Sequence, residues 1–115
     1  NKPTEENTFQ SIATIREQSK KHDVPVLFFF LPAKWVYLHN ADSHVGKISY
    51  YFLKGDYAYE TSDDFKKDYD KRKVMLHWDK DGHPNREGYK LISEIISKRF
   101  TEFLKSLNPS NNESK

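Results

Sequence analysis

The stretch DKDGHPNREGY, residues 79–89, runs directly into a long segment with helical periodicity, and this combination decides the fold. Gly82 allows a tight bend, Pro84 fixes its own φ, and Asn85 is a favourable N-cap for a helix that starts at the next residue. Apolar residues then recur at spacings of three and four: Tyr89, Ile92, Ile96, Phe100, Phe103 and Leu107. The pattern predicts a helix over residues 86–107. Its residues expected to be buried are Ile92, Ile96, Phe100 and Phe103.

The same stretch places a histidine between acidic residues and the start of a helix. His83 follows Asp81 and Asp79 closely, and this arrangement suits a general base whose imidazole ring is oriented by a nearby carboxylate. The alternative is a solvated loop that merely contains a histidine. The spacing of the residues does not by itself separate the two interpretations.

The upstream sequence alternates helical and strand-like segments. Residues 4–21 have helix start and stop signals, and the continuous apolar run 24–31 predicts a strand buried on both faces. Residues 35–38 are compatible with a short helix, residues 61–70 with a helix capped by Thr61 or Ser62, and residues 73–78 with a second strand. This alternation predicts an α/β fold with mainly parallel strands, in which 26–31 is more central than 74–76. The loop 79–85 follows the second strand, where functional loops of such sheets are found.

Composition excludes several classes of protein. At 115 residues the chain is one domain or part of one, and its 36% hydrophobic content is enough for a modest core. A net charge of +2, with lysines interleaved among acids, argues against a nucleic-acid binder. The absence of cysteine excludes disulfides, thiolate zinc sites and a cysteine nucleophile. No apolar run is long enough for a membrane span, and any targeting segment would lie upstream of the first residue, which is not Met.

The motif Asp81-Gly82-His83-Pro84-Asn85, followed by Gly88-Tyr89 and an amphipathic helix, resembles the last motif of SGNH (GDSL-type) hydrolases. The resemblance covers roughly residues 8–106. It implies a partial three-layer α/β/α domain of flavodoxin-like form, with residues 1–107 as its C-terminal part and 108–115 as a disordered polar tail. It also implies an ester hydrolase or O-acyltransferase that acts on a small-molecule or carbohydrate ester, with an extracytoplasmic or cell-envelope location favoured.

The sequence departs from that family in two respects. The position three residues before the histidine, where the family usually has its acid, is Lys80, so the role passes to Asp81 or, as the alternative, to Asp79. The Gly-Asp-Ser nucleophile block and the oxyanion residues are also absent. Its nearest imitation surrounds Ser43, which is better interpreted as a loop serine because too little chain separates it from His83. The expected catalytic residues are therefore His83 and Asp81, and the chain by itself is expected to be inert.

Two other hypotheses remain. Asp79, Asp81 and His83, with His77 nearby, have the residue types of metal ligands, but hard cations need more oxygen ligands and zinc sites draw on residues far apart in sequence. Neither a metal nor a cofactor is therefore expected. A non-catalytic binding or assembly domain of SGNH descent is the main alternative. If a preceding half is missing, an exposed apolar face or strand edge should mark where that half pairs, or where the chain self-associates.

Overall fold

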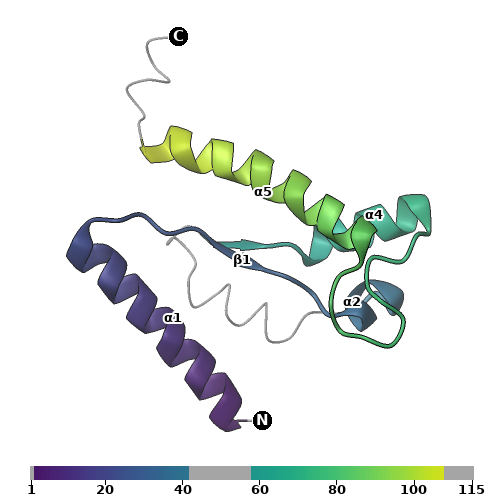
Figure 1. Ribbon diagram of the computed structural model, residues 1–115, viewed down its shortest axis with the longest axis horizontal. Coiled ribbons are helices and arrows are strands. Elements are labelled where there is room, and N and C mark those ends of the chain that lie inside the picture. Colours follow the sequence, from purple (N-terminus) through teal and green to yellow (C-terminus); the bar gives the residue numbers. More distant parts are fainter. Residues whose placement is uncertain (1, 42–57, 108–115) are drawn as a thin grey trace.

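The computed structural model describes residues 2–41 and 58–107 and shows a mixed α/β arrangement that is mostly helical (Figure 1). The elements in order are α1 (Lys2–His22), β1 (Phe28–Phe30), α2 (Lys34–Leu38), β2 (Ala58–Glu60), α4 (Ser62–Arg72) and α5 (Arg86–Leu107). Ser43, the preceding Asp42 and the tail 108–115 lie outside the described residues.

The described sheet consists of β1 and β2, which pair in parallel with Phe28 opposite Ala58 and Phe30 opposite Glu60. The parallel strand predicted within 24–31 is thus confirmed at its centre. The expectation that it is buried on both faces is wrong, because every residue of β1 is only half-buried. Phe29 packs against the hydrophobic core, but the described helices leave part of all three β1 residues exposed.

The prediction of a second strand over residues 73–78 is also wrong. Residues 73–78 form no strand, and within them only an isolated antiparallel bridge joins His77 to Pro84. The partner of β1 is instead β2, which directly precedes the helix predicted over residues 61–70 and was not itself predicted as a strand. The backbone groups of the 75–77 segment bond to side chains and to a loop: Leu76 N–H donates to the Tyr37 hydroxyl, and Asn85 binds the carbonyls. These contacts occupy the positions that a neighbouring strand would need.

A hydrophobic core forms where α2, α4, α5 and the 75–77 segment meet. Its buried members are Tyr37, Phe65, Leu76, Ile92 and Ile95, and Phe29, Leu38, Tyr59, Tyr69 and Leu91 pack against them. The short helix predicted near residues 35–38 is present as α2, and it contributes Tyr37 to this core. The core therefore lies at the carboxyl end of β1, beneath the beginning of α5.

Helix α5 begins and ends as the sequence predicted, at Arg86 and Leu107. Of the residues expected to be buried, Ile92 and Phe103 are, whereas Ile96 is 40% and Phe100 is 48% exposed. The core packs against the side of α5 that carries Ile95, and Ile96 and Phe100 lie outside this contact. The apolar arc of α5 is wider than the surface that packs against it, so the prediction for Ile96 and Phe100 was wrong.

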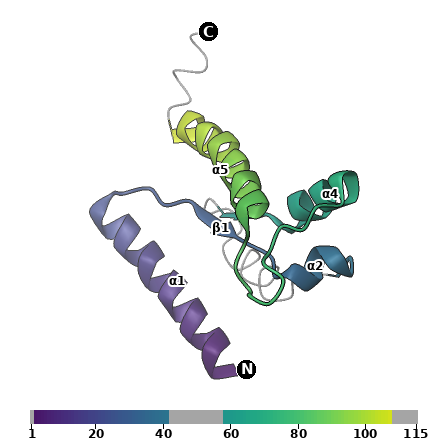
Figure 2. The ribbon, with the colours of Figure 1, turned by 45° about the vertical axis from the view of Figure 1, so that its right-hand side comes forward.

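Several large apolar side chains remain exposed outside this core. Helix α1 extends from the amino end of β1, whereas α2 and α4 lie at its carboxyl end (Figures 1 and 2). The exposed apolar residues are Ile15, Val24, Leu31, Trp35, Val74, Trp78, Tyr89, Ile96, Phe100 and Leu104. They lie on α1, α2, α5 and the segments between elements.

Among the described residues, no helix has both the length and the apolar content needed to cross a membrane.

Gly88 allows the first turn of α5 to lie directly on the 75–77 segment. A Cβ atom at this position would be 2.0 Å from the Leu76 carbonyl oxygen and 3.0 Å from Pro84 Cβ. Because the nearest atom belongs to the backbone, a side chain could be accommodated only by moving the helix or the segment. At Gly82, by contrast, a Cβ atom would meet nothing within 4 Å.

We predict that Gly88→Ala lowers the free energy of unfolding by about 2 kcal/mol, because overpacking against fixed backbone outweighs the higher helix propensity of alanine. Gly82→Ala is the matched control and should change stability by less than about 0.5 kcal/mol. Chemical denaturation followed by far-ultraviolet circular dichroism measures both variants. Equal stability of the two would show that α5 does not approach Leu76 this closely.

Candidate active site

Residues 78–83 form a loop that closes on itself between His77 and Pro84. The bridge between His77 and Pro84 closes its base, and the Trp78 N–H donates a hydrogen bond of 3.1 Å to the His83 carbonyl. The loop is exposed from Trp78 to His83. It therefore presents its side chains to solvent from a base fixed by backbone contacts.

The ring of His83 is bound to the carboxylate of Asp81. His83 Nδ1 contacts Asp81 Oδ1, and the same oxygen accepts a hydrogen bond of 2.9 Å from the His83 backbone N–H. Hydrogen bonds from the ring and the backbone of His83 hold the pKa of Asp81 below its ordinary value. The side chains are 76% (His83) and 54% (Asp81) exposed. Within the described residues no other hydrogen-bond partner is found for the ring, so Nε2 is available to a group from outside.

Of the two acids weighed from the sequence, the structure brings Asp81 and not Asp79 to the ring of His83. The backbone carbonyl of Asp79 instead accepts a hydrogen bond from the Lys34 ammonium. The position that Lys80 occupies is exposed. The contact between Asp81 and His83 is local, between residues two apart, so it depends on the conformation of the turn at Gly82.

A second histidine, His77, lies at the base of the loop in the opposite environment. It is 3% exposed, and its Nδ1 is 2.9 Å from the Tyr37 hydroxyl, with the two rings stacked at a centroid distance of 5.5 Å. The Tyr37 hydroxyl accepts a hydrogen bond from Leu76 N–H, so its own proton can be donated to His77 Nδ1. If Tyr37 donates to Nδ1, the ring of His77 is neutral and carries its proton on Nε2.

Burial is the main cause that lowers the pKa of His77. The positive charge of Lys34 lowers it further, and a backbone hydrogen bond to Pro32 opposes both. Burial also raises the pKa of Tyr37, which keeps its hydroxyl protonated. His77 is therefore a structural residue of the core, and the metal-ligand role considered for it does not fit a ring held on both sides by the protein.

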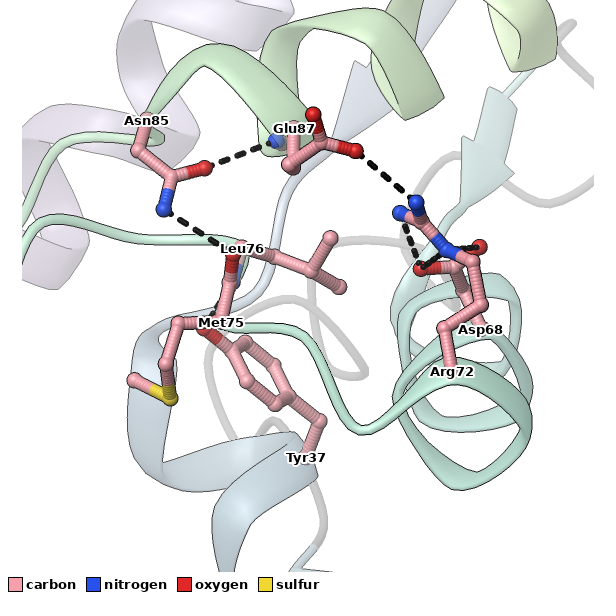
Figure 3. A network of polar contacts seen from close by, with 8 residues as sticks. Tyr37, Asp68, Arg72, Met75, Leu76, Asn85 and Glu87 are labelled. Carbon is pink, nitrogen blue, oxygen red and sulfur yellow. Dashed lines mark hydrogen bonds and ion pairs between the residues drawn. The ribbon is translucent and has the colours of Figure 1, made fainter.

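The start of α5 is joined to the 75–77 segment by Asn85, as Figure 3 shows. Its Oδ1 accepts a hydrogen bond of 3.0 Å from Gly88 N–H, which confirms the predicted N-cap. Its Nδ2 donates to the carbonyls of Met75 and His77, at 2.9 and 3.2 Å. Its backbone N–H donates to the Leu76 carbonyl at 3.1 Å. One residue thus fixes both the helix start and the base of the His83 loop.

Charged residues hold α4 against the same end of α5. Arg72 at the end of α4 binds Asp68 in its own helix at 2.9 Å and Glu87 in the first turn of α5 at 2.8 Å (Figure 3). The hydrogen bond from Arg72 lowers the pKa of Glu87. Farther along α5, Arg99 donates to the Tyr59 hydroxyl at 2.7 Å, which in turn donates to Asp64 at 2.8 Å. These contacts orient α5 relative to β2 and α4.

Lys34, the first residue of α2, reaches the loop from the other side. Its Nζ donates a hydrogen bond of 3.1 Å to the Trp78 carbonyl and a second one to the Asp79 carbonyl. No feature of the sequence predicts that Lys34, Tyr37 and His77 lie together. Their spacing shows no motif, and the only available signal was a histidine within the apolar run before the loop.

Among the described residues, no group of three or more His, Asp or Glu side chains is placed to hold a metal ion. Comparison with protein-family models, with curated proteins and with solved structures finds no match to this chain.

We predict that Asn85→Ala lowers the free energy of unfolding by about 3 kcal/mol, since it removes the helix cap and leaves two carbonyls without their donor. Asn85→Ser can keep the cap but not the two bonds to Met75 and His77, so its free energy of unfolding should fall by about 2 kcal/mol. Denaturant unfolding of the two variants separates these contributions. Wild-type stability of Asn85→Ala would contradict the role assigned to this side chain.

We also predict that stability depends on pH through His77. Because its pKa is lowered in the folded state, the unfolded chain binds a proton first as the pH falls below about 6.5, and folding is then opposed by up to about 1.4 kcal/mol per pH unit. The contribution of neutral His77 to the free energy of unfolding is thus complete well above pH 6.5 and is lost progressively below it. Unfolding free energies measured between pH 7.5 and pH 5 should decrease as the pH falls below about 6.5, with a slope of at most one proton.

The variant His77→Gln should have no such slope, because it cannot titrate. His39→Gln, which changes an exposed histidine, is the matched control and should keep it. The carboxylates with lowered pKa, Asp81 and Glu87, lose their contributions at lower pH and do not interfere in this range. A slope that survived in His77→Gln would assign the effect to another group.

Proposed function

We propose that this chain is the C-terminal part of an SGNH-type ester hydrolase or O-acyltransferase domain, in which His83 is the general base and Asp81 its orienting acid. The observation that supports the proposal most directly is the contact of Asp81 with His83 Nδ1 on a ring that is 76% exposed. A base of this kind needs one nitrogen held by an acid and the other open to a nucleophile.

In this mechanism each residue has one task. Asp81 keeps the ring proton on Nδ1, so that Nε2 can take the proton of a serine hydroxyl as its oxygen attacks the ester carbonyl. The imidazolium, stabilised by Asp81, then gives that proton to the leaving alcohol, and an acyl-serine remains. Water or an acceptor hydroxyl repeats the sequence in reverse. The serine and the donors that stabilise the oxyanion are expected from chain outside residues 1–115.

The position of the loop also supports the proposal. Lys34 begins α2 just after β1, and its bonds to Trp78 and Asp79 place the loop near the carboxyl end of β1. In parallel α/β sheets this is the edge where functional loops gather. The full three-layer α/β/α arrangement is part of the proposal, and β1 and β2 would be two of its parallel strands.

The exposed apolar side chains on α1 and α5 fit a domain that is completed by further strands and helices. Ile15, Ile96 and Phe100 are each between 40% and 48% exposed, so each leaves apolar surface that such an addition could cover. The same exposure favours the second candidate function, a non-catalytic binding or assembly domain of SGNH descent. In that case the surface binds a partner chain or a second copy, and His83 has no catalytic task.

We predict that His83→Ala lowers hydrolysis of a small ester such as 4-nitrophenyl acetate at least a thousandfold in the protein that carries the serine, because the general base is removed. Asp81→Asn should cost less, since the ring remains but loses the carboxylate that stabilises its charged form. Rates are measured under saturating substrate, together with thermal unfolding to show that both variants are folded.

The control is His39→Ala, which changes an exposed histidine outside the loop and should retain wild-type turnover. The isolated chain should show no activity above buffer. Full turnover in His83→Ala, or a full-length protein in which no Gly-Asp-Ser follows an earlier strand, would reject the enzyme and favour the binding or assembly domain.

A further inference from the structure

We propose that Lys34 is a positioning residue that holds the His83 loop in the geometry in which Asp81 binds the ring. The inference deepens the function proposed above and rests on it for its catalytic meaning. The geometric part concerns this chain alone. Lys34 is separated from Trp78 by 44 positions in sequence, so the contact is tertiary and does not follow from the loop sequence.

The loop has few contacts with the rest of the protein. Its base is fixed by the bridge between His77 and Pro84 and by the bond from Trp78 N–H to the His83 carbonyl. Beyond the base, the contact of Asp81 with His83 is internal to the loop, so its geometry depends on the conformation that the loop adopts. Among the hydrogen bonds and ion pairs of the described residues, those from Lys34 are the ones that tie residues 78–82 to another element.

The Lys34 ammonium binds two adjacent carbonyls and so restrains the orientation of the loop backbone as well as its distance from α2. A peptide unit is planar and its N–H points opposite to its C=O, so the direction of a carbonyl also fixes the direction of the following N–H. By binding the carbonyls of Trp78 and Asp79, Lys34 orients two consecutive peptide units. These units lead to the Cα atom of Lys80, so they restrict the path of the chain through Asp81 into the turn that leads to His83.

Lysine suits this task because its ammonium has three donors and no acceptor. A carbonyl pair is also a neutral partner, so the charge of Lys34 is not cancelled by a carboxylate at the loop. The same charge lies close enough to His77 to lower its pKa. Lys34 is therefore in contact with the loop and near the buried histidine at its base, between the carboxyl end of β1 and the proposed active site.

The test measures the position of the ring proton on His83 by ¹⁵N nuclear magnetic resonance of the imidazole, at a pH where the ring is neutral. In the wild-type chain, Asp81 should keep the proton on Nδ1. In Lys34→Met the loop loses its two bonds, and the proton should move toward the mixture of forms seen for a free histidine. Lys34→Arg retains charge and donors and should restore the wild-type state in part.

Lys67→Met is the matched control, because it removes an exposed lysine from α4 and should leave the His83 signals unchanged. Thermal unfolding shows whether each variant is folded, and Lys34→Gln replaces Lys34→Met in the comparison if the latter shows no cooperative transition. Repeating the measurement in about 0.5 M NaCl removes most of the long-range effect of the charge. The loss of the Nδ1 form should persist there, since it arises from the broken hydrogen bonds.

In the protein that carries the serine, Lys34→Met should lower kcat by up to about a hundredfold with little change in KM, because it misplaces the base and not the substrate. In a His83→Ala background the same substitution should have no further effect. An unchanged Nδ1 form in the folded Lys34 variant would overturn the positioning role, whatever the activity. If no variant and no wild-type protein hydrolyses esters while the ring proton responds as expected, the proposed function fails and the positioning of the loop stands.

Discussion

The side chain and backbone of Asn85 form the contact on which the rest of this structure depends. They bind four backbone groups on two segments: Gly88 N–H in the first turn of α5, and the carbonyls of Met75, Leu76 and His77. A backbone segment without strand partners is normally costly to bury, and here Asn85 binds its three carbonyls while the Tyr37 hydroxyl accepts from Leu76 N–H. Gly88 completes the arrangement, because only a residue without Cβ lets the helix come this close to Leu76.

This junction separates two histidines into different environments. His77 lies beneath it, in the core with Tyr37 and Phe65, where burial keeps its ring neutral. His83 lies above it, on a loop that the junction fixes at its base and that Lys34 binds at its first two residues, Trp78 and Asp79. Of the two, only the exposed ring of His83 is open to solvent and could act as the proposed base, whereas His77 is used by packing and by hydrogen bonds. The stability of the core and the placement of the proposed base depend on the same few backbone contacts.

Local chemistry explains why α5, its Asn85 cap and the pairing of Asp81 with His83 could be predicted from the sequence. A helix with a strong apolar period and a good N-cap is determined by residues that are neighbours in the chain. The 73–78 segment could not be predicted correctly, because the groups that occupy its backbone come from Tyr37 and Asn85. The exposure of Ile96 and Phe100 depends on how wide a surface covers α5, and the role of Lys34 on a tertiary contact. Neither leaves a pattern in sequence.

An exposed acid–base pair is chemically weak, and this limits what the loop can do without further chain. Opposite charges about 4 Å apart attract by only about 1 kcal/mol in water, compared with several times that in a partly desolvated site. With His83 76% exposed, water competes for both partners, and Asp81 contributes little to the stability of an imidazolium. Under the proposed function, the chain that brings the serine must also cover the loop and exclude water. Trp35, Trp78 and Tyr89, all large and about half exposed on or beside the elements that hold the loop, are the surface such a cover would contact. Completion of the active site and strengthening of its base would then be one event.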